Sequence, residues 1–168
     1  MKYFATFCLI LALLASCKSK TSSKQTERSN RTSFDTSQYT IDTSKISILT
    51  IDAGHSVQFR YAKSVELSRT DFRLTEVLLR DCINSTNDSS QVLKVYTLPF
   101  IDINNYKRQY IPFAKPNGDR FVWVNCFCAD FPFWKNKVVF VFDGGACFFN
   151  VEINLTKRAY GELYINSN

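Results

Sequence analysis

Apolar and polar positions follow a helical period in the middle of the chain. Ser68 can cap a first helical turn, Asp71 completes a capping-box pattern, and Leu67 and Phe72 stand where a hydrophobic staple needs them. With a period of about 3.6 residues, apolar and charged side chains separate onto opposite sides. The apolar side comprises Phe72, Leu78, Leu79, Cys82 and Ile83, and the polar side Arg69, Arg73, Glu76 and Arg80. We expect this helix to end near Asn87, because the Asn, Ser, Thr and Asp residues around it favour turns.

Beyond the helix the period changes to two, which is typical of strands. Residues 106–113 and 121–128 predict a hairpin, because the sequence Asn117-Gly118 between them supplies the backbone freedom of a tight turn. Shorter apolar runs at residues 46–51 and 57–61 are candidate edge strands.

A second hairpin is predicted from residues 138–142 and 147–155. We interpret the intervening Asp143-Gly144-Gly145 as its turn and not as an anion-binding site, since alternating strands on both sides require a reversal there. The core face of the later strand is expected to comprise Cys147, Phe149, Val151, Ile153 and Leu155. A closing strand over residues 160–166 would bury Leu163 and Ile165 by the same alternation.

These elements predict an α+β fold, with one long amphipathic helix packed on a meandering antiparallel sheet. The order of the elements is that of cystatin-like and NTF2-like folds. Residues 46–168 are sufficient for one domain with its own core, and we find no internal repeat.

The N-terminal residues have the three parts of a secretory signal. Lys2 precedes an apolar run over residues 4–15, which is shorter than the roughly 20 residues that span a bilayer. The sequence Leu14-Ala15-Ser16-Cys17 resembles the lipobox of bacterial lipoproteins, which implies that residues 1–16 are removed and that Cys17 is acylated. The alternatives are an ordinary signal peptide with an incidental thiol, and an uncleaved membrane anchor.

Residues 17–45 read as a disordered tether rich in Ser, Thr, Lys and Asn. Half of the net charge of +6 lies here, because six Lys or Arg face three acidic residues between residues 18 and 45. Nucleic-acid binding needs cations clustered on a folded face, so the charge distribution argues against it. A tether beside acidic lipid headgroups accounts for the charge more simply.

The second half of the chain resembles a group of small uncharacterised bacterial lipoproteins, over residues 66–166. The residues that carry the resemblance are Tyr106 to Tyr110, Asn117 and Gly118, Val122 to Cys128, Trp134 and Lys135, and Asp143 to Leu155. The resemblance implies a lipid-anchored protein of the cell envelope on the outer membrane or periplasmic face. It implies no catalytic residue.

Four cysteines remain after Cys8 leaves with the signal and Cys17 takes lipid: Cys82, Cys126, Cys128 and Cys147. An even number in an exported protein suggests disulfides, and the sequence allows three pairings. Buried free thiols are the alternative. A metal site with His55 lacks the usual Cys-x-x-Cys spacing, so we expect no metal and no cofactor.

Aromatic residues form 15% of the chain, and they concentrate around the strand that follows Gly118. Both faces of this strand are apolar. Either residues before 66 and around 92–104 cover the second face, or that face binds a peptide, glycan or apolar ligand. The candidate binding residues are Trp123, Phe131, Phe133, Trp134, Arg108, Gln109 and Tyr110.

Catalysis has little support in the sequence. The lone histidine, His55, lies in an expected loop, and the chain shows no nucleophile elbow. We therefore expect a non-enzymatic binding or scaffold domain at the envelope, with an envelope protein, peptide or glycan as partner. The alternative is an envelope enzyme, for example a hydrolase that uses carboxylates or His55.

Overall fold

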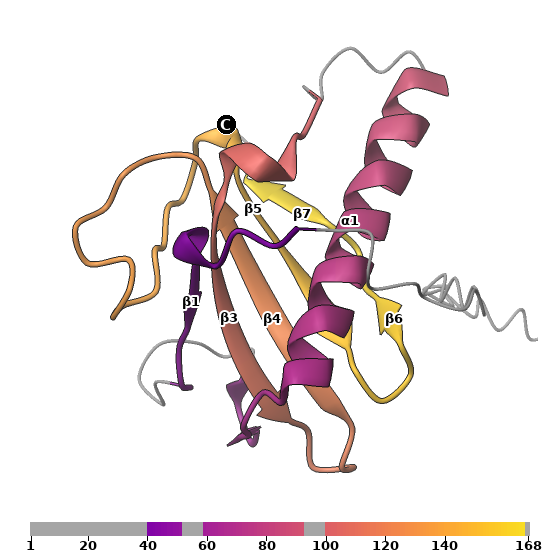
Figure 1. Ribbon diagram of the computed structural model, residues 1–168, viewed down its shortest axis with the longest axis vertical. Coiled ribbons are helices and arrows are strands. Elements are labelled where there is room, and N and C mark those ends of the chain that lie inside the picture. Colours follow the sequence, from indigo (N-terminus) through magenta and orange to yellow (C-terminus); the bar gives the residue numbers. More distant parts are fainter. Residues whose placement is uncertain (1–39, 52–58, 93–99, 167–168) are drawn as a thin grey trace, which may run out of the picture.

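The computed structural model describes residues 40–51, 59–92 and 100–166. One helix, α1 (Arg69–Val92), lies against one face of a seven-stranded sheet (Figure 1). The strands are β1 (Ile46–Ile48), β2 (Lys63–Ser64), β3 (Lys107–Ala114), β4 (Arg120–Phe127), β5 (Gly145–Asn154), β6 (Ala159–Tyr160) and β7 (Tyr164–Asn166). The α+β class is therefore confirmed. The signal segment, Cys17 and His55 lie outside the described residues.

The start of α1 follows the capping-box prediction. The Asp71 backbone N–H donates to the Ser68 hydroxyl at 3.1 Å, and the Ser68 N–H donates to the Asp71 carboxylate at 3.1 Å. Arg120 of β4 binds the same carboxylate at 2.8 Å. Two otherwise unpaired donors of the first turn are thus satisfied, and the helix start is tied to the sheet.

The prediction that α1 ends near Asn87 is wrong, because the helix continues to Val92. Thr86 and Ser89 donate their hydroxyls to backbone carbonyls four residues earlier, so they do not disrupt the helix. Asn87 is buried, and its amide binds both the N–H and the C=O of Ile101. A long-range contact therefore overrides the local preference of a polar run for turns.

The first predicted hairpin is confirmed. Strands β3 and β4 pair antiparallel from Lys107↔Phe127 to Ala114↔Arg120. Gly118 in the connection has a positive φ of 86°, a conformation that glycine adopts without strain.

The second predicted hairpin is wrong in its first half. Residues 138–142 form no strand, and β5 pairs directly with β4 across the register Phe121↔Asn154 to Phe127↔Phe148. A long loop therefore joins β4 to β5, and Asp143 to Gly145 lead into β5 instead of closing a hairpin. In Figure 1 this loop, drawn in orange, extends away from α1.

The edges of the sheet depart from a pure antiparallel meander. Strand β1 pairs parallel with β3, which makes the sheet mixed, and β2 joins β3 antiparallel. The predicted closing strand is split into β6 and β7, which both pair with β5. No strand forms over residues 59–61, where Tyr61 has a φ of 67°; the rest of the predicted 57–61 strand lies outside the described residues.

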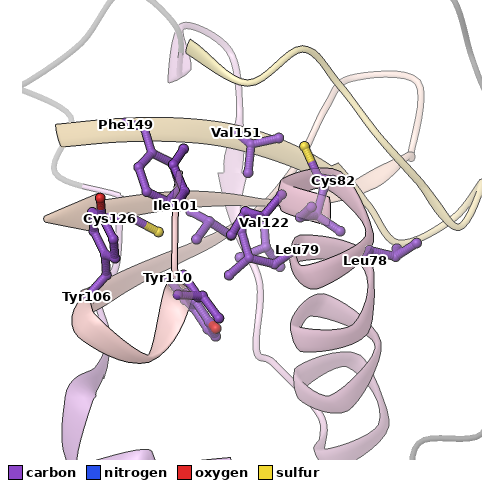
Figure 2. Close-up of a cluster of buried hydrophobic side chains, with 14 of the residues drawn as sticks. Leu78, Leu79, Cys82, Ile101, Tyr106, Tyr110, Val122, Cys126, Phe149 and Val151 are labelled. Carbon is purple, nitrogen blue, oxygen red and sulfur yellow. The ribbon is translucent and has the colours of Figure 1, made fainter. Parts of the chain in front are cut away.

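The main core lies between α1 and the sheet. Figure 2 shows Leu79 and Cys82 of the helix beside strand residues such as Val122 and Val151. The predicted inward residues Leu78, Leu79, Cys82, Ile83, Phe149, Val151, Ile153 and Leu155 are all buried there, with Phe72, Leu163 and Ile165 partly buried beside them. The alternation predicted for the helix and for most of β5 is therefore confirmed, except at Glu76, which is buried instead of solvent-facing.

Two segments cover the opposite face of the sheet. Leu49, Ile51, Phe59 and Ala62 pack on one end of it, and the loop between β4 and β5 packs on the other end. The expectation that residues around 92–104 cover this face is wrong for the described part, because Ile101 and Ile103 belong to the helix-side core. A second layer of loops therefore buries most of the aromatic face.

Candidate functional site

The sheet divides the candidate binding residues between its two faces. Arg108 and Tyr110 of β3 lie on the helix side, while Gln109 and Trp123 lie on the opposite side. Phe131, Phe133 and Trp134 belong to the loop that packs on this opposite side. Alternation along β3 thus separates neighbours in sequence, and the candidates form two distinct sites instead of one groove.

The helix-side site is a buried ionic cluster. The Glu76 carboxylate lies 3.5 Å from the Arg108 Nε and 3.8 Å from an Arg80 guanidinium nitrogen. Tyr110 donates its hydroxyl to the same carboxylate. Glu76, Arg108 and Tyr110 are each at most 1% exposed, so a dissolved substrate cannot reach them.

Ionisation of Tyr110 is opposed by its surroundings. Burial raises the pKa of its phenol well above the ordinary value, and the neighbouring Glu76 carboxylate raises it further. The phenol therefore remains a neutral hydrogen-bond donor. Because the ionic cluster is also buried, its role is structural: it joins α1 to β3.

The four cysteines divide into one disulfide and two thiols. Cys128 and Cys147 form the disulfide, while Cys82 and Cys126 are free and buried. Burial raises the pKa of the Cys82 thiol to about 12, and burial also raises that of Cys126 well above its ordinary value. Since the thiolate is the reactive form, neither thiol suits nucleophilic chemistry.

We expect these thiols to resist modification in the folded protein. Treatment of the native protein with iodoacetamide at pH 8 should leave Cys82 and Cys126 unmodified. After denaturation without reduction both should be alkylated, and peptide mapping should recover a linked Cys128–Cys147 peptide. Alkylation of Cys128 in the denatured, unreduced protein would contradict the pairing.

Removal of the disulfide should destabilise the protein. The bond closes a segment of 19 residues, and the chain-entropy relation for such a loop gives about 3 kcal/mol. Urea unfolding of a Cys128→Ser/Cys147→Ser double variant should therefore show a free energy of unfolding lower by about 3 kcal/mol. The wild-type protein unfolded under reducing conditions, which also lacks the disulfide, serves for comparison. A Cys82→Ala variant is not a suitable control, because it removes a buried side chain from the core.

The aromatic loop, residues 129–144, is held to the sheet by buried amides as well as by the disulfide. The Gln109 amide donates to the carbonyls of Trp134 at 2.5 Å and Lys137 at 2.6 Å, and its oxygen accepts from the Val139 N–H at 2.9 Å. Asn125 donates to the Gln109 oxygen at 3.1 Å and to the Val139 carbonyl at 2.8 Å. All four hydrogen-bonding positions of the Gln109 amide are used.

The aromatic side chains of this loop point both inward and outward. Trp134 and Val139 are buried against Phe127, whereas Phe133 is 43%, Phe140 70% and Phe142 89% exposed. The Phe140 and Phe142 rings meet edge to face at 5.1 Å. An anchored loop therefore presents large apolar side chains to solvent, which is a common property of interaction surfaces.

Charged groups lie at the base and the ends of the aromatic loop. Lys107 pairs with Asp130 and also lies 5.6 Å from the centre of the Trp134 ring, as does Lys135.

Both tryptophans are buried, and Trp123 donates its indole N–H to Asn150. Neither tryptophan is therefore available as a large exposed contact.

Other kinds of site are not formed by the described residues. No group of three His, Cys, Asp or Glu residues that could hold a metal ion occurs within residues 40–51, 59–92 and 100–166. In the same part of the chain no helix has the length and apolar character needed to cross a bilayer.

Sequence reasoning missed Glu76 and Asn125 as structural residues. Glu76 lies on the side of the helix that the sequence predicts to be polar and exposed. Only its contacts with Arg108 and Tyr110 in the structure show that it is buried. Asn125 had a signal, because a carboxamide between apolar residues of a strand implies a buried hydrogen-bond partner. That partner is Gln109, which is directly opposite it in the β3–β4 register.

Comparison with protein-family models, curated proteins and solved structures found no match. The structure itself defines an α+β domain whose distinguishing surface is the aromatic loop, which the Cys128–Cys147 disulfide bounds.

Proposed function

We propose that this chain is a lipid-anchored, non-enzymatic protein of the cell envelope, and that the aromatic loop is its protein-binding surface. One observation supports the binding role: the loop is fixed to the sheet by the disulfide and by Gln109, yet its Phe140 and Phe142 side chains remain exposed to solvent. A surface that is ordered before binding loses less conformational entropy when a partner arrives.

The chemistry of the loop favours a polypeptide partner over a glycan. Its exposed aromatic residues are phenylalanines, which have no polar group to hydrogen-bond a sugar hydroxyl. Trp123 and Trp134, which do carry an N–H donor, are buried. Apolar contact with another protein is the interaction that Phe133, Phe140 and Phe142 can make.

The anchoring half of the proposal rests on the N-terminal sequence. The lipobox-like residues before Cys17 and the resemblance to small bacterial lipoproteins support it. We also retain the cystatin-like or NTF2-like outline as a proposal, supported by the order of one helix followed by antiparallel strands.

Intact mass of the protein from a native membrane fraction tests the anchor. We expect a mature chain that begins at Cys17 and carries added acyl mass. A Cys17→Ser variant should keep its full leader and lack that mass. A wild-type chain that retains residues 1–16 without lipid would refute the anchor.

Site-specific photocrosslinking in cells tests the binding surface. A benzophenone amino acid in place of Phe142 should form adducts with one or a few discrete polypeptides. The matched control is the same replacement at Tyr61, which is 79% exposed but lies near β2 at the opposite end of β3. Equal adducts at both positions, or none at Phe142, would count against the proposed surface.

A further inference from the structure

Cations gather at the end of the sheet opposite to the Cys128–Cys147 disulfide. Strand β2 pairs with the last residues of β3. At the start of β4, the Arg120 N–H donates to the Thr156 hydroxyl and the Arg120 guanidinium donates to the Glu66 carbonyl. These contacts bring together residues 59–66, the start of α1, the β3–β4 turn and the β5–β6 turn, which lie at the lower end of the view in Figure 1.

We call these four segments the basic end. Its cationic residues are Arg60, Lys63, Arg69, Arg73, Lys115, Arg120, Lys157 and Arg158, and its acidic residues are Glu66, Asp71, Asp119, Glu152 and Glu162. The basic end thus has a surplus of three positive charges, whereas the rest of the described chain has one acidic residue more than basic residues. Lys115 and Arg120 are paired with Glu152 and Asp71, and the other six cations have exposed side chains. In the sequence these cations are spread between residues 60 and 158, so no basic run reveals them.

A tight turn displays an aromatic side chain among these cations. The Ala62 N–H donates to the Phe59 carbonyl at 2.9 Å, and the buried Phe59 ring contacts Phe113 edge to face. Arg60 and Tyr61 are thereby held outward. Tyr61 is 79% exposed and has a φ of 67°, which bulky residues rarely adopt. Cations beside an exposed aromatic ring are typical of surfaces that lie at a membrane interface.

We propose that the basic end docks on the anionic phospholipid headgroups of the membrane to which the chain is anchored. This inference rests on the anchoring half of the proposed function. Thr40 is 23 positions after Cys17, and a chain of that length reaches at most about 80 Å. The anchor therefore keeps the bilayer within reach of the domain, which favours this occupant over an anionic molecule that must diffuse to it.

Docking by the basic end also sets the orientation of the domain. Attraction between exposed cations and headgroups falls off within about a Debye length, so the six exposed cations contribute together only when this end faces the bilayer. The aromatic loop begins and ends at the other end of β3 and β4. Docking therefore presents the loop away from the membrane, where a protein partner can reach it.

A fluorescent label at position 61 tests the docking. Full-length Tyr61→Cys protein from native membranes is labelled with the polarity-sensitive thiol reagent acrylodan and reconstituted into phosphatidylcholine vesicles, with or without about one third phosphatidylglycerol. On the anionic vesicles alone, the label should show a blue-shifted emission and reduced quenching by acrylamide. About 1 M salt should remove both effects. The matched probe is acrylodan at Phe142→Cys in the aromatic loop, which should stay quenchable on both kinds of vesicle.

Charge reversal at residues other than the labelled one gives an independent measurement. Arg73→Glu together with Arg158→Glu should lower the ratio of shielded to exposed label at position 61 by roughly fivefold for each cation lost. The matched control is Lys135→Glu together with Lys137→Glu, which makes the same change of charge in the aromatic loop and should leave the shielding unchanged. Circular dichroism checks that both pairs of exposed substitutions preserve the fold.

The outcomes separate docking from anchoring. Protein that stays on neutral vesicles but shows no shielding at position 61 on anionic ones overturns docking and leaves the anchor standing. Protein that leaves neutral vesicles, yet binds anionic ones with position 61 shielded, refutes the anchor and supports the basic end as a lipid-binding surface. Shielding at Phe142 in place of position 61, or equal loss of shielding in the two charge-reversal pairs, would also overturn docking by the basic end.

Discussion

Replacement of Arg108 by methionine should lower the free energy of unfolding by about 3–5 kcal/mol, because it removes one partner of a buried ion pair. The Glu76 carboxylate would remain at 1% exposure, with Tyr110 and the more distant Arg80 as its remaining contacts. A buried charge without adequate compensation is among the few single changes with an effect of this size. Urea unfolding followed by circular dichroism measures it.

A double variant distinguishes a stranded charge from a loss of packing. Glu76→Gln together with Arg108→Met removes both charges and retains an oxygen that can accept from Tyr110, so it should recover most of the lost stability. Lys115→Met is the matched control, since its pair with Glu152 is 39% and 35% exposed. We expect a change below about 1 kcal/mol there. A double variant no more stable than Arg108→Met would show that packing dominates.

Replacement of Gln109 by leucine should lower the free energy of unfolding by about 3–5 kcal/mol, because several buried backbone groups lose their partners together. The Val139 N–H and the carbonyls of Trp134 and Lys137 depend on this amide. The aromatic loop should detach from the sheet as well, which hydrogen exchange of the Val139 amide would detect.

The matched control for Gln109→Leu is Asn136→Leu, which changes an exposed amide of the same loop. Its effect should stay within about 0.5 kcal/mol. Unchanged protection of the Val139 amide in Gln109→Leu would mean that the disulfide and the packing of Trp134 hold the loop without the amide network.

Several elements can be predicted from the sequence alone, because they depend only on residues that are close together in the chain. The capping box of Ser68 and Asp71 needs only residues three positions apart, and Asn117-Gly118 needs only its own backbone freedom. Alternation along β5 reports the burial of Phe149, Val151 and Ile153, because a strand with one buried face repeats every two residues. Each of these signals is contained within one element.

Elements that depend on distant partners could not be predicted in this way. The end of α1 depends on Asn87 binding Ile101, and the burial of Glu76 depends on Arg108, which is 32 positions away in the sequence. Residues 138–142 are a continuous apolar run of Val and Phe, which favours a strand, yet β5 pairs with β4 and leaves them in the aromatic loop. The pairing of β5 with β4, which is not contained in the local pattern of residues 138–142, decides this outcome.

The sequence by itself determined the class of the fold, the start of the helix and the first hairpin. Only the tertiary structure decided which two cysteines pair, which face of the sheet each candidate residue occupies, and which phenylalanines remain exposed. The physical reason is that propensity, capping and periodicity act over a few residues, whereas pairing and burial depend on which distant segments meet in space.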